Sequence, residues 1–483
     1  MEQALATSRY TFRVPMSEGY ALFHASSGSV FKVDGPDAEE ISTLLSGDRR
    51  LVPPGTFDER LTARLRRNGF LVEPGFDEVA VVRERYWAAR GSAPVVLLVT
   101  TTMDCNLGCY YCYESRTPDA LRLTDAETLV DIAAQRLGGR KRSLHVDWYG
   151  GEPMLGIDFL ERGSLALQEY CRSAGIRYHA SIISNGTRWP DDPQSFVARH
   201  KIREVQISFD GMKDNHDRRR RYRPEHRSLT DQSSFEQAAA LVDELVRHTR
   251  VDLRYNADQG NAGDLGAFID FAKARGWFDG PFRCVLMVAK LSAYSERSSF
   301  LRPHELDPER FEELQDLARR ELPSKAQDDQ DIVSGFPHPK TSVCGALAHD
   351  SAVVGADGLE YRCGLQVGEP GRATGRFLGM PGVRPGDSPE SFPDQSWWAD
   401  FDPTTLPTCS RCSFLPVCWG GCPKRHLDGD GTAIRSEGGF WRTNLPRMVA
   451  AGFTDQVAAD FEFTEAEQFR TGLPVEAPGE TSC

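Results

Sequence analysis

The sequence predicts an α/β protein whose central part is a parallel β-sheet with helices outside it, either open or curled into a partial barrel. Apolar, β-branched runs alternate with amphipathic helical segments between residues 91 and 322, as in a series of β-α units. The residues before this region read as a small α+β unit. The residues after it are rich in Cys, Gly and Pro and show little periodicity, so we expect a domain held by more than an apolar core.

The length and the net charge of the chain exclude some classes of function. A chain of 483 residues suits about three domains. Its 57 Lys and Arg residues against 70 Asp and Glu residues give a net charge of −13, which disfavours a main role in binding nucleic acid or an anionic membrane. No apolar run reaches the ~18 residues of a membrane span, and the first residues start no secretory signal. We expect a cytoplasmic enzyme with no nucleic-acid or membrane partner.

Residues 1–90 are typical of a winged-helix-like module. Strands are followed by two short helices and a closing strand, with Ser-Gly and Asn-Gly signals at turns. The segment lacks a concentrated basic helix, which disfavours DNA binding. The expected elements are the strands Tyr10–Val14, Ala21–His24 and Ser29–Val33, the helices Asp37–Leu45 and Thr56–Arg67, and the strand Phe70–Val72.

Residues 91–322 carry six strand candidates separated by amphipathic helices. Continuous apolar runs such as Val95–Val99 are typical of strands buried on both faces. Sheets of this kind place ligand sites at the carboxyl ends of their strands. The expected strands are Val95–Val99, Leu144–Tyr149, Tyr178–Ile183, Glu204–Phe209, Val251–Tyr255 and Phe282–Met287. The clearest helices are Ala126–Leu137, Phe159–Ala174, Phe235–Val246 and Leu265–Ala274.

The sequence of the C-terminal part predicts a linker over residues 323–340, a cysteine-rich domain over 341–470 and a flexible tail over 471–483. The chain has 12 cysteines, although a protein of this size needs no disulfides to fold. Most of them cluster at ligand-like spacing, which points to metal or iron–sulfur sites. Cys171 and Cys284 stand alone in a predicted helix and strand, where we expect buried small hydrophobes.

The first cysteine group directly follows the first buried strand. Cys105, Cys109 and Cys112 have the spacing C-x3-C-x2-C, with Tyr111 just before the last cysteine. A structural zinc site normally closes with four ligands, usually from two paired knuckles. Three thiols with no nearby fourth Cys or His suit an iron–sulfur cluster with one iron left open. A zinc knuckle or a redox thiol cluster is the alternative interpretation.

This loop, with Tyr111 and its position at a strand end, resembles the radical S-adenosylmethionine (radical SAM) superfamily. The resemblance covers about residues 94–322 and implies a partial (β/α)6 TIM-like barrel. It also implies that the three cysteines hold a 4Fe–4S cluster whose fourth iron binds the amine and carboxylate of S-adenosylmethionine. Later strand ends fit the family: Gly150-Gly151-Glu152-Pro153 is similar to its GGEP element, and Ser184-Asn185-Gly186-Thr187 to its SNGT element.

Two further strands end in polar residues that resemble the family's cofactor site. Gln206, Ser208 and Asp210 alternate on one face and lead into an SxDG-like segment, and Arg254 is a candidate carboxylate or substrate clamp. The cofactor contacts implied by the resemblance are Tyr111, Gly150, Gly151, Glu152, Ser184, Asn185, Gln206, Ser208, Asp210 and Arg254. The basic segment 216–223 is interpreted as a loop over the barrel mouth that contacts peptide, with a solvated surface loop as the alternative.

The second cysteine set resembles the SPASM extension of radical SAM enzymes. It reads C-x13-G-x4-C from Cys344 through Gly358 to Cys363, followed by C-x2-C-x5-C-x3-C from Cys409 to Cys422. The resemblance implies two auxiliary 4Fe–4S clusters, and hence three clusters in all. It assigns Cys344, Cys363 and Cys422 to the first and Cys409, Cys412 and Cys418 to the second. A pair of zinc sites is the alternative.

The chain departs from this extension after Cys422. The family usually has a seventh cysteine within a few tens of residues, but only Cys483 remains. The second auxiliary cluster would then take Cys483, an oxygen ligand such as Asp428 or Asp430, or no fourth ligand. The first auxiliary cluster also lacks an obvious fourth ligand. These alternatives stay open.

The N-terminal module resembles the recognition elements that bind leader peptides of ribosomally made, modified peptides, which capture a strand at a sheet edge. The sequence therefore predicts a peptide maturase that abstracts hydrogen from a precursor peptide and installs an intramolecular C–C or C–S cross-link. Its partners would be that peptide and a low-potential electron donor such as flavodoxin or ferredoxin. Formylglycine formation, as in anaerobic sulfatase maturases, and peptide epimerisation are alternatives. An electron-transfer or zinc-binding protein is a different class. The sequence assigns no catalytic acid or base.

Overall fold

The computed structural model describes residues 4–47, 50–114, 116–227, 233–293, 296–327, 337–377, 391–453, 457 and 461–469. The chain divides into two compact units that are discontinuous in sequence. The first unit joins Met1–Ser92 with Gln330–Cys344 and Asp400–Cys483, and the second joins Ala93–Asp329 with Gly345–Ala399. The expected tail at 471–483 and much of the expected linker lie outside the described residues. The predicted domain boundaries, which follow chain order, stay predictions.

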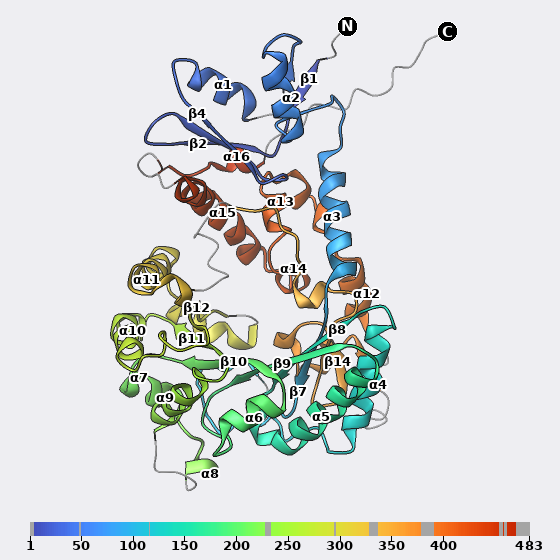
Figure 1. The fold of residues 1–483 in the computed structure, drawn as a ribbon, viewed down its shortest axis with the longest axis vertical. Coiled ribbons are helices and arrows are strands. Elements are labelled where there is room, and N and C mark those ends of the chain that lie inside the picture. Colours follow the sequence, from blue (N-terminus) through green and yellow to red (C-terminus); the bar gives the residue numbers. More distant parts are fainter. Residues whose placement is uncertain are drawn as a thin grey trace. The chain divides into compact units, whose positions relative to one another are not determined.

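The second unit is built on a mixed sheet of nine strands in the order β12-β11-β10-β9-β8-β7-β13-β14-β15 (Figure 1). The six strands from β7 to β12 run parallel in sequence order, which confirms the predicted α/β fold with a partial barrel. Their bounds are β7 Val95–Thr100, β8 Ser143–Tyr149, β9 Arg177–Ser184, β10 Ile202–Phe209, β11 Arg250–Ala257 and β12 Cys284–Lys290.

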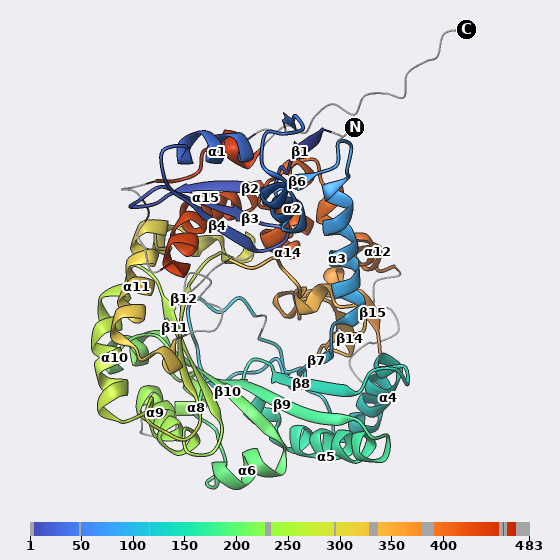
Figure 2. The ribbon, with the colours of Figure 1, turned by 45° about the horizontal axis from the view of Figure 1, so that its top comes forward.

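Helices lie along the outer face of this curved part of the sheet, as Figure 2 shows for α4, α5, α6, α9 and α10. Local signals set their ends: Asp192 accepts from the Ser195 backbone N–H at the start of α6, and Gly138 ends α4 with φ 54°. The helices of this region are α4 Asp125–Leu137, α5 Ile157–Ser173, α6 Pro193–Arg199, α7 Lys213–Arg219, α8 Pro224–Arg227, α9 Ser234–Leu245, α10 Leu265–Ala274 and α11 Pro308–Glu321.

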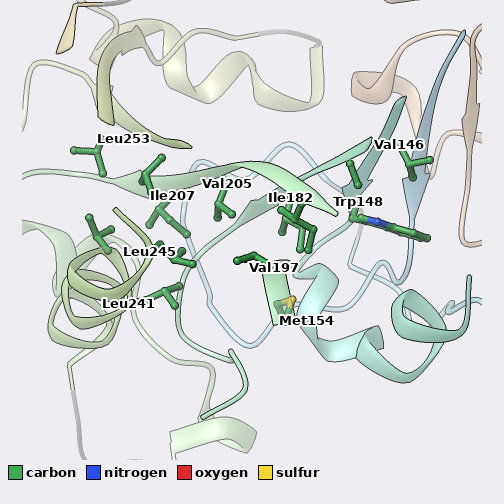
Figure 3. Packing of buried hydrophobic residues seen from close by; sticks show 14 of the residues in the cluster. Val146, Trp148, Met154, Ile182, Val197, Val205, Ile207, Leu241, Leu245 and Leu253 are labelled. Atoms are coloured by element: carbon green, nitrogen blue, oxygen red, sulfur yellow. The ribbon is translucent and has the colours of Figure 1, made fainter. Parts of the chain in front are cut away.

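The core of the second unit lies between the strands and these helices. Along β8 the buried residues Leu144, Val146 and Trp148 alternate with less buried polar ones, because side chains of a strand point to opposite faces in turn. Figure 3 shows Ile182 and Ile207 facing Val197 of α6 and Leu241 and Leu245 of α9, and the Trp148 ring meets that of Phe159 in α5 with centroids 6.3 Å apart. The alternation therefore leaves the polar side chains on the inner face of the curved sheet.

Three short strands extend the sheet beyond β7, and the sequence did not predict them. β13 (Ala352–Val354) pairs in parallel with β7, with Ala352 opposite Leu97, and β14 (Leu359–Tyr361) pairs antiparallel with β13. β15 (Gly375–Arg376) pairs with β14. Strands of two or three residues are too short to show a periodicity in the sequence. They form because they pair with the existing sheet. Cys363 follows the end of β14 in this extension.

The N-terminal elements of the first unit occur in the predicted order. An antiparallel sheet of β2 (Thr11–Pro15), β3 (Tyr20–His24) and β4 (Ser29–Val33) precedes α1 (Ala38–Leu45), α2 (Glu59–Arg67) and β6 (Leu71–Val72). The helix expected from Thr56 begins at Glu59, because Asp58 caps it by accepting from the Leu61 N–H at 2.8 Å. The sequence missed β1 (Leu5–Thr7), which pairs with β5 (Leu51–Val52) and β6, and also the helix α3 (Glu78–Ser92).

The first unit also contains the C-terminal cysteine-rich segment. The Tyr86 hydroxyl donates to the Phe401 carbonyl at 2.7 Å, and the rings of Phe12 and Phe414 stack with centroids 4.9 Å apart. The remaining helices are α12 Pro393–Asp400, which leads into this segment, and α13 Leu415–Cys418, α14 Pro423–Leu427, α15 Gly431–Gly452 and α16 Glu465–Gln468. Among the described residues, no helix combines the length and apolarity that crossing a bilayer requires.

Candidate active site

A cavity of about 480 Å³ lies in the second unit at the carboxyl ends of the parallel strands. The structure brings most of the predicted site residues of this unit together there. Those that line the cavity are Cys105, Cys109, Tyr111, Cys112, Gly150, Gly151, Ser184, Asn185, Gln206, Ser208, Arg254 and Cys363. Glu152 and Asp210 are not part of this lining and are fully buried.

The cysteine loop follows β7 and is fixed by its neighbours. Asn185 at the end of β9 donates from Nδ2 to Cys105 Sγ at 3.7 Å and to the Asn106 side chain at 2.9 Å. Burial raises the pKa of the Cys105 and Cys109 thiols, and it raises the pKa of Cys112 to about 11. Thiolates in such a site need a positive partner, which a bound metal cluster supplies.

The two glycines after β8 let the backbone approach the cysteine loop closely. A Cβ on Gly150, whose φ is 150°, would lie 2.4 Å from the Thr102 carbonyl oxygen. A Cβ on Gly151 would lie 2.3 Å from the Asp104 carbonyl oxygen. The Gly151 N–H donates to Thr102 at 3.0 Å, so this turn and the start of the cysteine loop form one backbone-bonded layer.

Glu152, expected to contact the cofactor, is engaged by the protein itself. Its carboxylate accepts from Ser184 Oγ at 2.8 Å, from the Asn185 N–H at 2.7 Å and from the Met154 N–H at 3.2 Å. Burial raises the pKa of Glu152, and these hydrogen bonds oppose that shift. The described contacts give Glu152 a positioning role, and its predicted contact with the cofactor stays a prediction.

Asp210 likewise stands behind the cavity wall. It accepts from the Tyr111 hydroxyl at 2.8 Å, from Arg219 Nε at 3.1 Å and from Asn256 Nδ2 at 3.2 Å. Asn256 in turn accepts from Arg254 Nε at 3.1 Å. This network joins β10, β11 and the cysteine loop, so it orients the aromatic ring that precedes Cys112.

Two arginines of the basic segment are buried against the cysteine loop. Arg219 forms an ion pair with Asp210 and another with Asp258 at 2.9 Å. Arg220 lines the cavity and donates from Nη1 to the Tyr111 hydroxyl at 2.6 Å, while its buried Nε has no hydrogen-bond partner among the described residues. Burial lowers the pKa of Arg220, but Tyr111, Cys109 and Asp210 together hold that pKa above its usual value. These two arginines therefore support the cysteine loop, and the peptide contact expected of the segment stays a prediction.

Sequence reasoning missed several residues of the cavity wall. Tyr113 and Glu114 line it just after the last cysteine of the loop, and the Tyr113 and Tyr149 hydroxyls share a hydrogen bond. Burial raises the pKa of Glu114 to about 7. These residues lie in an irregular loop where no periodicity marks an inward-facing side chain, so only their neighbours in space reveal them.

The remaining predicted cysteines are divided between the units. Cys363 follows β14 in the second unit and lines the cavity, whereas Cys344 belongs to the first unit. The first unit also holds Cys409, Cys412, Cys418 and Cys422, and Cys483 lies outside the described residues. Among the described residues, no three His, Cys, Asp or Glu side chains converge closely enough to bind a single metal ion. The assignment of these cysteines to auxiliary clusters stays a prediction.

Residues 99–248, which include the cysteine loop and the ends of β8 to β10, match the model of the Radical SAM superfamily. These residues therefore form a radical SAM domain. This confirms the predicted radical SAM resemblance for this segment, and a radical SAM domain indicates an enzyme. A segment of 109 residues is 34% identical to the serine-type anaerobic sulfatase-maturating enzyme of Klebsiella pneumoniae, over 21% of this chain and 27% of that enzyme. The same enzyme of Klebsiella aerogenes matches at 34% identity over 21% of this chain and 26% of that enzyme. The chain thus matches about a quarter of the length of these curated relatives.

A solved structure supports the same fold. Native anSMEcpe with bound AdoMet aligns with a TM-score of 0.54 and 17% identity, covering 75% of this chain and 100% of that chain. Its complex with AdoMet and the Cp18Cys peptide aligns with a TM-score of 0.54 and 19% identity, covering 75% and 99%. At these identities the likeness shows the fold alone.

The residues of the cavity fit the cofactors that a radical SAM domain uses, a 4Fe–4S cluster and S-adenosylmethionine. Three thiols on one loop are the donor set of such a cluster. The buried, unpartnered Nε of Arg220 offers a hydrogen bond to an anionic group in the cavity. Gly150 and Gly151 line the cavity, so their backbone borders the space that a ligand would occupy.

Proposed function

We propose that this chain is a radical SAM maturase that removes a hydrogen atom from a residue of a ribosomally made precursor peptide and installs an intramolecular C–C or C–S cross-link. The observation that carries the proposal is the convergence of three thiols and the polar ends of four strands on one cavity of the radical SAM domain. The separate N-terminal α+β module supports a peptide substrate, because small sheet modules with open edges bind extended segments.

The cavity residues predicted from the sequence have proposed roles toward the cofactors. Cys105, Cys109 and Cys112 would hold the 4Fe–4S cluster. The groups that would hold S-adenosylmethionine are the Gly150-Gly151 backbone and the side chains of Ser184, Asn185, Gln206, Ser208 and Arg254. When bound, these cofactors supply a carbon-centred radical that takes hydrogen from unactivated carbon, which no protein side chain can do by acid–base chemistry.

The chain itself orients the reactants and keeps water away. Asp210 and Arg220 hold the Tyr111 hydroxyl from two sides, so the ring beside the cysteines has a fixed orientation. Apolar side chains complete the wall, which limits access of solvent and of competing hydrogen donors to the reaction. These apolar lining residues are Leu98, Leu107, Ile183, Leu291, Leu301 and Leu365.

The leader of the precursor would bind the N-terminal module. β5 lies at the edge of the small sheet β5-β1-β6, and Leu51 on this edge is an exposed large apolar residue. A cavity of about 630 Å³ borders the same sheet and the helix α2, and its lining includes Val52 and Phe57. An extended peptide could add a strand at β5 and place side chains in this cavity.

Two auxiliary 4Fe–4S clusters complete the proposal. Cys344, Cys363 and Cys422 would serve the first, and Cys409, Cys412 and Cys418 the second. They would accept the electron released when a substrate radical is oxidised to product. A flavodoxin or ferredoxin would supply the electron that starts each turnover.

The first experiment measures 5′-deoxyadenosine release by the anaerobically purified, dithionite-reduced protein with S-adenosylmethionine. The Cys105→Ala/Cys109→Ala/Cys112→Ala variant should lose this activity and the iron of one cluster. The control is Cys284→Ala, which changes a buried cysteine of β12 outside the cavity lining. Undiminished 5′-deoxyadenosine release by the triple variant would refute the proposal.

The second experiment identifies the reaction. Small open reading frames beside the gene are the source of precursor candidates, and each synthetic peptide is incubated with the reduced enzyme. A cross-link removes two hydrogens from the peptide mass. An unchanged mass with an altered stereocentre would replace cross-linking with epimerisation.

Formylglycine formation is the second candidate, favoured by the 34% identity to serine-type anaerobic sulfatase-maturating enzymes. A peptide carrying the Ser or Cys of a sulfatase active site is the probe. Trapping of a product aldehyde by a hydrazide would support this candidate over cross-linking. Zinc without iron or sulfide in the anaerobically purified protein would contradict both.

A further inference from the structure

The second cysteine loop of the first unit bends sharply between Cys418 and Cys422. Trp419, Gly420 and Gly421 follow one another with φ values of 52°, 79° and 72°. Three successive residues in the left-handed region turn the chain back on itself, and two of them are glycines, which adopt this conformation without strain. The turn begins at the end of α13 and stops just before α14.

Both glycines lie beside potential ligands. A Cβ on Gly420 would lie 3.6 Å from Cys409 Sγ. A Cβ on Gly421 would lie 2.7 Å from Cγ and 2.8 Å from Cδ of Glu437. Glu437 is on α15, which follows α14, so this helix places a carboxylate beside the cysteine loop. The close approach depends on the missing side chain of Gly421.

In the described part of the chain, the carboxylate of Glu437 is not engaged by other side chains at this loop. Lys340 Nζ donates to the Cys418 carbonyl oxygen at 3.2 Å. Among the described residues, the Glu437 carboxylate has no hydrogen-bond or ion-pair partner. A carboxylate that the protein leaves unbonded beside cysteine thiols is a candidate metal ligand.

The other carboxylates considered from the sequence have partners of their own. Asp428 forms an ion pair with Lys424 at 2.5 Å. Asp430 also has an interaction partner. Glu437 differs from both because its carboxylate lies on the turn between two cysteines.

We propose that Glu437 is the fourth ligand of an iron–sulfur cluster held by Cys409, Cys412 and Cys418. The inference rests on the auxiliary cluster of the proposed function and names its missing ligand. A carboxylate is a competent oxygen ligand for iron. Gln468 supports the same site, because its Nε2 donates to Cys412 Sγ at 3.7 Å and hydrogen bonds of this kind stabilise a thiolate ligand. The cluster is then complete without Cys483.

The test uses the full chain with Cys105, Cys109 and Cys112 replaced by alanine, so that all cluster iron belongs to auxiliary sites. In this background Glu437→Gln should release iron to a chelator at least about tenfold faster, since changes around metal ligands weaken sites by such factors. The electron paramagnetic resonance spectrum of the reduced protein should change as well. Glu437→Cys, which supplies a thiolate, should restore slow release with a new spectrum.

Asp428→Asn is the matched control and should leave both readouts unchanged, as should Cys483→Ala. Unchanged iron release and spectra in Glu437→Gln, or loss of iron in Cys483→Ala, would overturn the assignment of Glu437 alone. A background protein without any iron would overturn the auxiliary cluster itself and this ligand with it. Circular dichroism of each variant verifies that α15 and the rest of the fold are retained.

Discussion

The Glu152 carboxylate at the end of β8 accepts a hydrogen bond of 2.7 Å from the backbone N–H of Asn185 at the end of β9. Asn185 in turn donates to Cys105 Sγ at 3.7 Å. Glu152 is fully buried, so this bond is not exchanged with water and fixes one strand end against the next. A residue outside the cavity lining thus sets the position of a group at the cysteine loop.

Replacement of Glu152 by glutamine should weaken this arrangement. The amide nitrogen of glutamine cannot accept a hydrogen bond, so one donor among Ser184, Asn185 and Met154 is left unpaired, at a cost of about 1–3 kcal/mol. We expect a lower thermal transition temperature and weaker binding of S-adenosylmethionine in calorimetry. Glu127→Gln, at an exposed position of α4, is the control. Equal transition temperatures for the two variants would contradict the positioning role.

Replacement of Gly151 by alanine should disturb the proposed cluster site directly. Its Cβ would collide with the Asp104 backbone at 2.3 Å, and backbone cannot move aside as a flexible side chain can. We expect a loss of about 1–3 kcal/mol of stability and less iron per chain after reconstitution. Gly263→Ala is the control, because a Cβ there meets no atom within 4 Å. The close-approach argument fails if Gly151→Ala binds iron as the original protein does.

Replacement of Arg220 by glutamine should lower the reduction potential of the 4Fe–4S cluster proposed for the cysteine loop. The guanidinium is only 7% exposed, and a buried positive charge favours the reduced, more negative cluster. A tenfold change in the reduction equilibrium corresponds to about 59 mV for one electron, and we expect a shift of this order in a spectroscopic titration. The neighbouring Arg221 has an exposed side chain, so Arg221→Gln should leave the potential unchanged. Equal shifts of the reduction potential in the two variants would count against a local effect of Arg220.

The N-terminal module should lose stability in mild acid because of His24. Burial, with a smaller effect of Arg85, lowers the pKa of His24 from 6.5 to about 3. Above pH 6.5 the imidazole is neutral in both the folded and unfolded states, and its contribution to stability is fully present. As the pH falls from 6.5 toward 3, the unfolded chain binds a proton that the folded chain does not, so the contribution is progressively lost.

At pH 5 the free energy of unfolding is lower by about 2 kcal/mol, since each pH unit below 6.5 corresponds to about 1.4 kcal/mol. Hydrogen exchange of the β2–β4 sheet at pH 7 and pH 5, corrected for intrinsic rates, measures the loss. His24→Gln should flatten the pH dependence, whereas His304→Gln, at an exposed position, should not. If the stability of His24→Gln depends on pH as steeply as that of the original protein, His24 is not the cause.

Local sequence signals predicted the strands of the barrel and the cysteine loop that follows β7. Runs such as Val95–Val99 are apolar throughout because both faces of the strand are covered, so composition alone reveals them. The alternation on β8 separates Trp148, which packs against helices, from its inward-facing neighbours. The polar residues at the ends of successive strands could be predicted to meet, since parallel strands share one carboxyl edge.

Tertiary structure decided which of those residues reach the cavity. Glu152 and Asp210 look like ligand groups in the sequence, but burial and protein hydrogen bonds engage them behind its wall. Cys363 reaches the cavity because β13 pairs with β7, an association between residues more than 250 positions apart. Glu437 is placed beside the cysteine loop by the path of α15 and the space above Gly421. Periodicity and motif spacing report on neighbours along the chain, whereas these contacts depend on packing between distant segments.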